Sequence, residues 1–351
     1  MTTRLSPARI RAEQLDNPKM RARDLAGQLG ISEAALVAAG CGAGTVRLDA
    51  PMPTIFPLLE SLGEVMALTR NESAVHEKIG VYDNFIAGKH ASMMLGAEID
   101  MRMFPGHWAH AFSVETTTAE GETRRSLQFF DKAGDALHKI HLRAASSDEA
   151  WAGITRSLAH TDQSCEFEAE IIAAPAAAEN DDNVPLDDLR RRWQSMTDTH
   201  QFVSILKVLK LSRLRALESI GPEFAERILA GSVATMMLAA ADAAVPIMVF
   251  VGNRGCIQIH SGPIKSIRSM GPWLNVMDAD FHLHLRTDRI AGAWLVRKPT
   301  DKGYVTSLEA YDQAGELIIQ FFGKRIEGQD ERTEWRTVME SLPRLELAGA
   351  A

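Results

Sequence analysis

The feature that most constrains this fold is an internal repeat, because the second half of the chain follows the pattern of the first. Four pairs of segments show it: 70–80 with 252–262, 97–102 with 279–284, 126–135 with 307–316, and the closing helices that begin at Trp151 and Trp335. The spacing between the copies stays almost constant, and so long a match would rarely arise by chance. Two copies are too few for a solenoid, so the chain should fold as two similar halves.

Each copy begins with helical segments and continues with a series of alternating strands. This order indicates an α+β fold in which each half carries helices and a large antiparallel β-sheet. The stretch 173–185 is of low complexity, first rich in alanine and then in acidic residues, and is typical of a linker. We expect an N-terminal half at 1–172, a linker at 173–186 and a C-terminal half at 187–351, with a ligand cleft between the copies.

Composition narrows the class of protein. The chain has 46% hydrophobic and 24% charged residues, as globular proteins do, and no apolar run long enough to span a membrane. Its N-terminus lacks the apolar core of a signal peptide. The cysteines Cys41, Cys165 and Cys256 show no CxxC spacing, which argues for a reducing cytoplasm and against structural zinc. A net charge of −8 disfavours broad binding to nucleic acids or anionic membranes.

The segment 23–36 has the sequence pattern of a helix-turn-helix, with a tight turn at Gly30 and a serine cap before a second helix. A DNA-binding regulator would place the first turns of that second helix in the major groove. Glu33 and the apolar residues after it offer no side chain that reads base edges, and glutamate repels phosphate. A helical hairpin packed on its own domain is the better interpretation.

A helix with a histidine near its start is predicted around 200–209. Its apolar residues recur at helical spacing: Phe202, Ile205, Leu206 and Leu209. Three preceding residues can supply the capping oxygen: Thr197, Asp198 and Thr199. His200 would then extend from a rigid first turn, where a neutral imidazole can bind a metal. The plain alternative is that His200 caps or packs its own helix.

The run Thr-Asp-Thr-His-Gln-Phe at 197–202, with Leu-Ser-Arg-Leu at 211–214, resembles the proximal-ligand helix of the cytoplasmic haemin-degrading or haem-transfer proteins, the HemS-like family. The resemblance covers nearly the whole chain, including Leu-Thr-Arg-Asn-Glu at 68–72 and Gly-Asn-Arg-Gly-Cys at 252–256. It implies a haem-binding cleft in which His200 is the axial ligand of the iron.

The same resemblance implies roles for several cations. Arg102, in Asp-Met-Arg-Met-Phe-Pro, would face the iron from the distal side. Four residues would contact the rest of the haem, the cations among them holding the propionates: Arg213, Lys298, Gln320 and Arg325. Arg213 lies thirteen residues after His200, so it can reach a propionate only if the haem lies along the helix or the helix bends near 211–212.

Each of these cations also has an ordinary interpretation. In the predicted strand 98–104, Asp100 and Arg102 share one face, which favours a solvated face on which the two side chains pair. His260, His282 and His284 could form a cupin-like metal site, but no carboxylate completes a ligand set. His76 or His284 could serve a second haem, although a core histidine is the better interpretation of His76.

The function that we predict from the resemblance is binding of imported haem and its oxidative degradation with release of iron. Haem would be the ligand, and its degradation would need O₂. No GxGxxG motif for binding a flavin or nicotinamide cofactor follows a predicted strand, so the electrons would come from an external donor. The competing interpretation is a non-catalytic carrier that delivers haem to a separate haem oxygenase. The implied partners are an inner-membrane haem importer, that oxygenase and a second copy of the chain.

Overall fold

The computed structural model describes residues 5–118, 120–173, 178–325 and 330–345. By contacts, the chain forms two compact units. Unit 1 holds the described residues within 1–70, 77–173 and 252–258; unit 2 holds those within 71–76, 174–251 and 259–351. Each unit therefore contains one short segment from the other half of the sequence.

The first half of the chain contributes these elements in order: α1 (Pro7–Asp16), α2 (Ala22–Leu29), α3 (Glu33–Ala38), β1 (Thr45–Leu48), α4 (Met52–Ile55), η1 (Phe56–Leu62), β2 (Val65–Arg70), β3 (Ala74–Gly80), β4 (Phe85–Ile86), β5 (Ser92–Leu95), β6 (Asp100–Met103), η2 (Pro105–His107), β7 (His110–Thr117), β8 (Thr123–Phe130), β9 (Ala136–Leu142) and α5 (Asp148–Ser157). In unit 1 the antiparallel strands pair in the order β1-β7-β8-β9-β2, and β4-β5-β6 pair separately.

The second half repeats this order: α6 (Leu186–Gln194), α7 (Gln201–Leu209), α8 (Arg213–Ile220), β10 (Ala225–Ile228), α9 (Ser232–Asp242), β11 (Ile247–Gly252), β12 (Cys256–Gly262), β13 (Ile267–Met270), β14 (Trp273–Met277), β15 (Phe281–Arg286), η3 (Thr287–Arg289), β16 (Gly292–Thr300), β17 (Gly303–Tyr311), β18 (Leu317–Gly323) and α10 (Thr333–Glu340). Unit 2 has the antiparallel orders β10-β16-β17-β18-β11 and β13-β14-β15. The predicted α+β duplication with a large antiparallel sheet in each half is confirmed.

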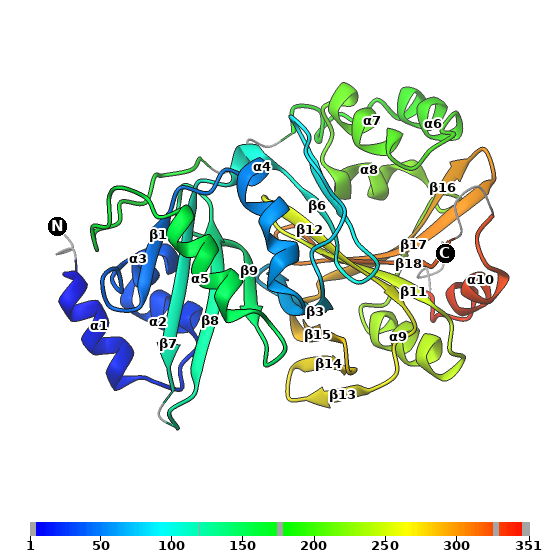
Figure 1. Cartoon of the computed structure of the whole chain (residues 1–351). Helices are drawn as coiled ribbons and strands as arrows, with labels where there is room; N and C mark the ends of the chain where they lie inside the picture. The colour runs from blue at the N-terminus through cyan, green and yellow to red at the C-terminus, as the bar shows by residue number, and fades with distance from the viewer. Residues whose placement is uncertain (1–4, 119, 174–177, 326–329, 346–351) are drawn as a thin grey trace. The chain divides into compact units, whose positions relative to one another are not determined.

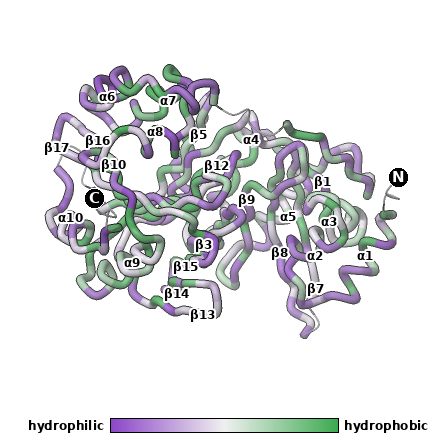
Figure 2. The backbone as a smooth tube through the Cα atoms, turned by 180° about the vertical axis from the view of Figure 1, so that it is seen from behind, coloured by the Kyte–Doolittle hydropathy of each residue, from purple (hydrophilic) through white to green (hydrophobic). Residues whose placement is uncertain are grey.

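Both sheets are covered on two faces, because alternate strand residues point to opposite sides. In unit 1, α5 packs with Leu127 and Ile140, whereas α3 packs against Phe112 and Phe130 on the other face. In unit 2, α9 and α10 share one core with Leu308, while α6, α7 and α8 lie on the opposite face (Figure 1). The end of the β7–β8 hairpin is hydrophilic and exposed (Figure 2).

Two asparagines occupy equivalent turns in the two copies. In unit 2, Asn71 Oδ1 accepts bonds from the backbone of residues 73 and 74, and its Nδ2 donates to Ile318 O at 2.8 Å. In unit 1, Asn253 Oδ1 accepts from the backbone of residues 255 and 256, and its Nδ2 donates to Leu137 O at 2.8 Å. The Asn71 turn is thus hydrogen-bonded to β18, and the Asn253 turn is hydrogen-bonded to the equivalent strand β9.

One sequence-based expectation needs correction. The run Pro-Glu-Phe-Ala-Glu-Arg-Ile-Leu at 222–229 predicts a helix from its sequence alone, but Ala225–Ile228 form β10, whose backbone pairs with β16 as β1 pairs with β7. Sheet pairing here overrides the helix propensity of Ala-Glu-Arg. The preferred interpretation of 23–36 as a packed helical hairpin is confirmed by α2 and α3. Glu33, Ala34, Leu36 and Val37 are buried in unit 1, so α3 cannot enter a DNA groove.

The predicted linker at 173–186 is described only in part, since residues 174–177 lie outside the described residues. Asn180 Nδ2 donates to Leu209 O at 2.9 Å, and the Asp181 carboxylate accepts from the Ser212 backbone N–H at 2.8 Å. The acidic end of this stretch therefore packs on the connection between α7 and α8. Its role in joining two halves stays a prediction.

A buried histidine in unit 1 should make the fold sensitive to acid. His138 lies between Thr69 and Tyr82 in the core, and burial lowers its pKa to about 3. The unfolded chain binds a proton near pH 6.5, so the stability present above that pH is lost as the pH falls toward 3. The loss is at most about 1.4 kcal/mol per pH unit. Urea unfolding at pH 4 and pH 7 measures it, and His138→Gln should reduce the difference. An undiminished difference in this variant contradicts the assignment.

Candidate functional site

His200 stands at the first turn of α7 with a side chain that is 92% exposed. Its Nδ1 lies 2.7 Å from Asp198 Oδ1, and its backbone N–H donates to the same oxygen at 2.7 Å. That backbone bond is the main cause of the lowered pKa of Asp198, so the carboxylate is an acceptor. An ionised acceptor places the proton on Nδ1 and leaves Nε2 as the basic nitrogen.

The cap of α7 differs from the expected one. His200 itself occupies the N-cap position, and no cap side chain bonds into the helix; instead, Asp198 holds the His200 backbone and ring together. In metal-binding histidines the N–H of the second ring nitrogen commonly donates to a carboxylate, which fixes the tautomer and the orientation of the ring. The arrangement of His200 and Asp198 matches that pattern.

His200 and Arg213 lie at the starts of two separate helices. Helix α7 ends at Leu209, Lys210 adopts a left-handed conformation with φ 52°, and α8 begins at Arg213 after a Ser212 cap. The Arg213 guanidinium consequently lies 5.0 Å from the centre of the Phe202 ring, in the first turn of α7. Of the two alternatives for Arg213, the bend near 211–212 is present, as a break between α7 and α8.

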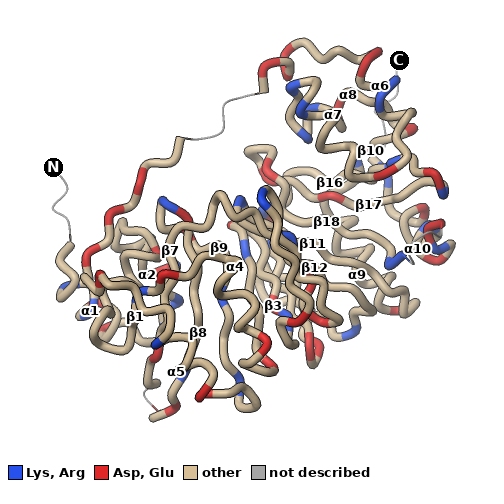
Figure 3. The backbone as a smooth tube through the Cα atoms, turned by 45° about the horizontal axis from the view of Figure 1, so that its top comes forward, with Lys and Arg blue, Asp and Glu red and all other residues tan. Residues whose placement is uncertain are grey.

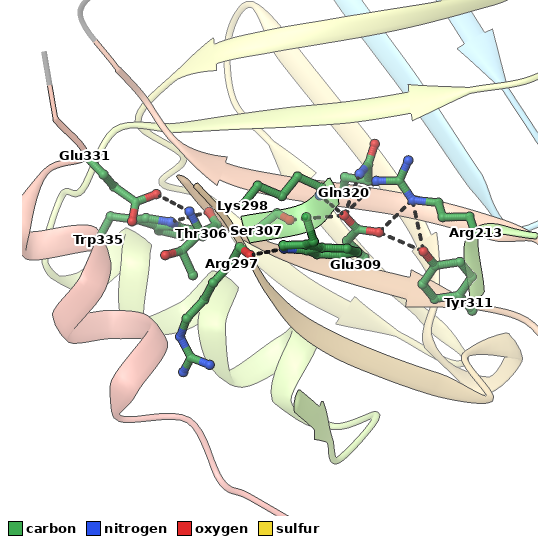
Figure 4. Close-up of polar contacts among 11 residues, drawn as sticks. Arg213, Arg297, Lys298, Thr306, Ser307, Glu309, Tyr311, Gln320, Glu331 and Trp335 are labelled. Carbon is green, nitrogen blue, oxygen red and sulfur yellow. Dashed lines mark hydrogen bonds and ion pairs between the residues drawn. The ribbon is translucent and has the colours of Figure 1, made fainter. Parts of the chain in front are cut away.

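A buried carboxylate that the sequence analysis missed organises the cations. Glu309, on β17, is 0% exposed and accepts from Arg213 through Nε at 2.8 Å and Nη2 at 2.7 Å (Figure 4). Four further side chains donate to it within the sheet: Lys298 at 2.9 Å, Tyr311 at 2.7 Å, Gln320 at 3.0 Å and Ser307 at 3.1 Å. Three predicted ligand-contacting residues thus meet on one carboxylate.

The charges in this cluster do not cancel. Burial alone would raise the pKa of Glu309, but Arg213 and Lys298 hold it well below its ordinary value. Burial lowers the pKa of Lys298 to about 8, against the attraction of Glu309. Below that pH the two cations and one anion carry a net charge of about +1. Basic residues also line α7 and α8, beside the acidic stretch at 179–182 (Figure 3).

The same face of the unit 2 sheet continues as an aromatic surface. Phe250 on β11 and Phe322 on β18 are half-buried, with ring centres 4.9 Å apart. Phe250 is the register partner of Gln320. Exposed Arg325 follows β18, and its charge contributes to lowering the pKa of Asp198. Unit 2 therefore offers an imidazole, aromatic rings and cations on connected elements.

Arg102 belongs to unit 1, on β6, and forms an ion pair with Asp100. It also donates to Met101 O at 3.2 Å, and its side chain is 34% exposed. The pairing expected for a solvated face is therefore present. Burial raises the pKa of Asp100, although Arg102 opposes this. A distal role for Arg102 stays a prediction.

The other histidines lie in structural positions. His76 is fully buried and its ring is 4.9 Å from Phe281, while His260 stacks on the same phenylalanine at 3.9 Å. His284 Nδ1 lies 2.6 Å from Asn275 Oδ1. Among the described residues, no group of three or more His, Cys, Asp or Glu side chains could hold a metal ion. The cupin-like interpretation is therefore wrong for this part of the chain.

Comparisons with known proteins agree over nearly the full length. The haemin-degrading HemS.ChuX domain matches residues 30–158 and 210–342, segments that include Arg213 but not His200. The hemin transport protein HemS of Yersinia enterocolitica is 38% identical over 337 residues, covering 95% of this chain and 96% of the relative. HmuS of Yersinia pestis, also a hemin transport protein, is 37% identical, with coverages of 95% and 96%.

Two solved structures are similar in fold and sequence. Holo-PhuS of Pseudomonas aeruginosa, a heme-binding protein, has a TM-score of 0.94 and 42% identity, covering 97% of this chain and all of its own. ChuS of Escherichia coli O157:H7, a heme degrading enzyme, has a TM-score of 0.87 and 36% identity, with coverages of 96% and 98%.

The ring of Phe202 should stabilise unit 2 by more than its volume. It is 1% exposed, packs on Trp193, and carries Arg213 and Lys298 over its face at 5.0 and 4.9 Å. Phe202→Leu keeps an apolar side chain but loses both cation–π contacts, and should lower the free energy of unfolding by about 1–3 kcal/mol. Denaturant unfolding tests this, with Val203→Leu, at a 64% exposed neighbour, as the unaffected control. Equal stability of the two variants would refute the role of the ring.

Proposed function

Because the chain belongs to the haemin-degrading HemS/ChuX family, we propose that it binds haem with His200 as the axial ligand of the iron. The observation that carries this proposal is the exposed imidazole whose Nδ1 is bonded to Asp198. Nε2 is then the nitrogen available to iron, and the carboxylate fixes the orientation of the ring.

The other groups of unit 2 fit the remainder of the ligand. A porphyrin needs an apolar surface, which Phe250 and Phe322 provide, and cations for its two propionates. Arg213 is partly exposed and Arg325 is exposed, whereas the Lys298 side chain is only 4% exposed. We assign the propionate contacts to the two arginines and Gln320, with Lys298 acting from within the cluster.

Oxidative degradation of bound haem is our first candidate for the activity, with the haem as substrate. In that reaction His200 holds the iron, the cations of unit 2 orient the macrocycle, and Arg102 supplies a permanently charged donor on the distal side. Electrons and O₂ come from outside the chain. ChuS, described as a heme degrading enzyme, supports this candidate.

Delivery of haem to a separate oxygenase is the second candidate, and one observation favours it. The His200 side chain is 92% exposed, and an iron ligand that is open to solvent is suited to transfer between proteins. The relatives described as hemin transport proteins are in keeping with this role.

We propose that the protein acts in the cytoplasm with three partners: an importer in the inner membrane, a haem oxygenase and a second copy of the chain. Of the described helices, none has the length and apolar character needed to cross a bilayer.

Replacement of the proposed iron ligand should abolish specific haem binding. We expect the wild-type protein to show a Soret change that saturates at one hemin per chain, and His200→Ala to weaken binding by at least about 100-fold, since a metal–ligand bond is lost. Absorbance titration measures both. His160→Ala, at an exposed histidine of unit 1, is the matched control. A His200→Ala spectrum identical to that of the wild type would disprove the assignment.

The two candidate activities differ in one experiment. The wild-type haem complex is incubated with a chemical reductant and O₂, and the Soret band and released iron are followed. Degradation predicts loss of the band with iron release, and slower loss in Arg102→Ala. An unchanged band, together with transfer of haem to apomyoglobin, supports delivery instead.

A further inference from the structure

We propose that Glu309 is a positioning residue for the carboxylates of haem, because it fixes Arg213 so that the outer edge of the guanidinium meets a propionate. The inference rests on the proposed function and names the contact that selects the ligand.

Glu309 binds the guanidinium as a fork. The two bonds from Arg213 use Nε and Nη2, at 2.8 and 2.7 Å, and Tyr311 OH accepts a further bond from Nε at 3.1 Å. Bidentate pairing of this kind fixes the plane of the guanidinium. Within the described residues, Nη1 makes none of these bonds, so its two N–H groups remain for a ligand.

Exposure decides which cation of the cluster meets the ligand. The Arg213 side chain is 25% exposed, whereas Lys298 is 4% and Glu309 is 0% exposed. Ser307 and Gln320 complete the shell around Glu309 Oε1, at 3.1 and 3.0 Å. The charges of Lys298 and Glu309 are therefore buried, and Arg213 is the cation of the cluster that is exposed at the surface.

The repeat offers an internal comparison. Glu33 begins α3 after the Ser32 cap, as Arg213 begins α8 after the Ser212 cap. In unit 1 the carboxylate is thus on the helix, where Glu33 pairs with Arg70 and Lys139, and a glutamine, Gln128, takes the place of Glu309 on the strand.

The unit 1 cluster also contains two cations and one carboxylate, but it is less exposed. The side chains of Glu33, Arg70 and Lys139 are 6%, 16% and 11% exposed, against 25% for Arg213. Of the two clusters, the one in unit 2 therefore presents the more accessible charged donor to a carboxylate ligand.

The test compares two ligands that differ only in their carboxylates: hemin and its dimethyl ester. Glu309→Gln is nearly isosteric but cannot form the bidentate ion pair, so Arg213 loses its fixed plane. We expect affinity for hemin to fall about 10-fold, as for one charge-assisted hydrogen bond, and affinity for the ester to be unchanged. The Soret spectrum of the bound complex should retain its histidine-ligated form.

Two variants control for simple structural damage. Glu33→Gln removes the equivalent buried carboxylate of unit 1 and should leave the hemin-to-ester ratio as in the wild type. Tyr311→Phe keeps Glu309 but removes the hydroxyl that bonds both Glu309 and Arg213, and should shift the ratio in the same direction by about 2-fold to 5-fold. If Glu309→Gln does not fold, Tyr311→Phe replaces it as the test variant.

Equal loss for both ligands in Glu309→Gln, or no loss for either, overturns the inference. Wild-type protein that binds hemin and the ester equally well also overturns it while leaving the proposed function intact. Wild-type protein that binds neither ligand overturns the proposed function itself.

Discussion

The interaction on which the candidate site depends is a buried carboxylate shared by two cations. Removing such charges from water costs several kcal/mol per ion, and the cost is offset only when every donor and acceptor is satisfied. Glu309 meets this condition through Arg213, Lys298 and three uncharged donors. Because the cations also lie over Phe202, the charge balance of the sheet is connected to the first turn of α7, where His200 stands.

Each copy buries one carboxylate beside two cations, but the two copies place these charges on opposite elements. Unit 1 places its acid on the helix and a cation on β9, while unit 2 places a cation on the helix and its acid on β17. The fold tolerates either arrangement because both leave two positive charges and one negative charge in the same layer. What differs is the group that extends beyond the layer, so a duplicated scaffold can carry an asymmetric site.

The sequence allowed prediction of the duplication, the strand at 98–104 and the helix at His200, since each follows from periodicity or from matching segments. The strand β10 was missed because its residues favour a helix when considered alone; comparison of 225–228 with β1 would have corrected this. Glu309 was missed because an acid in a strand usually faces solvent. Its burial depends on Arg213 and Lys298, which approach from a helix and from a neighbouring strand, and no local pattern reports such a meeting.

The paired asparagine turns have a consequence for biosynthesis. Unit 1 contains residues 252–258, and Asn253 bonds to the backbone of residues 70 and 137. A nascent chain that has just completed the first sheet lacks this turn, because the ribosome must still synthesise more than a hundred residues. Until the turn emerges, the first half lacks the two hydrogen bonds that Asn253 donates to residues 70 and 137, so the second half of the sequence completes the first sheet.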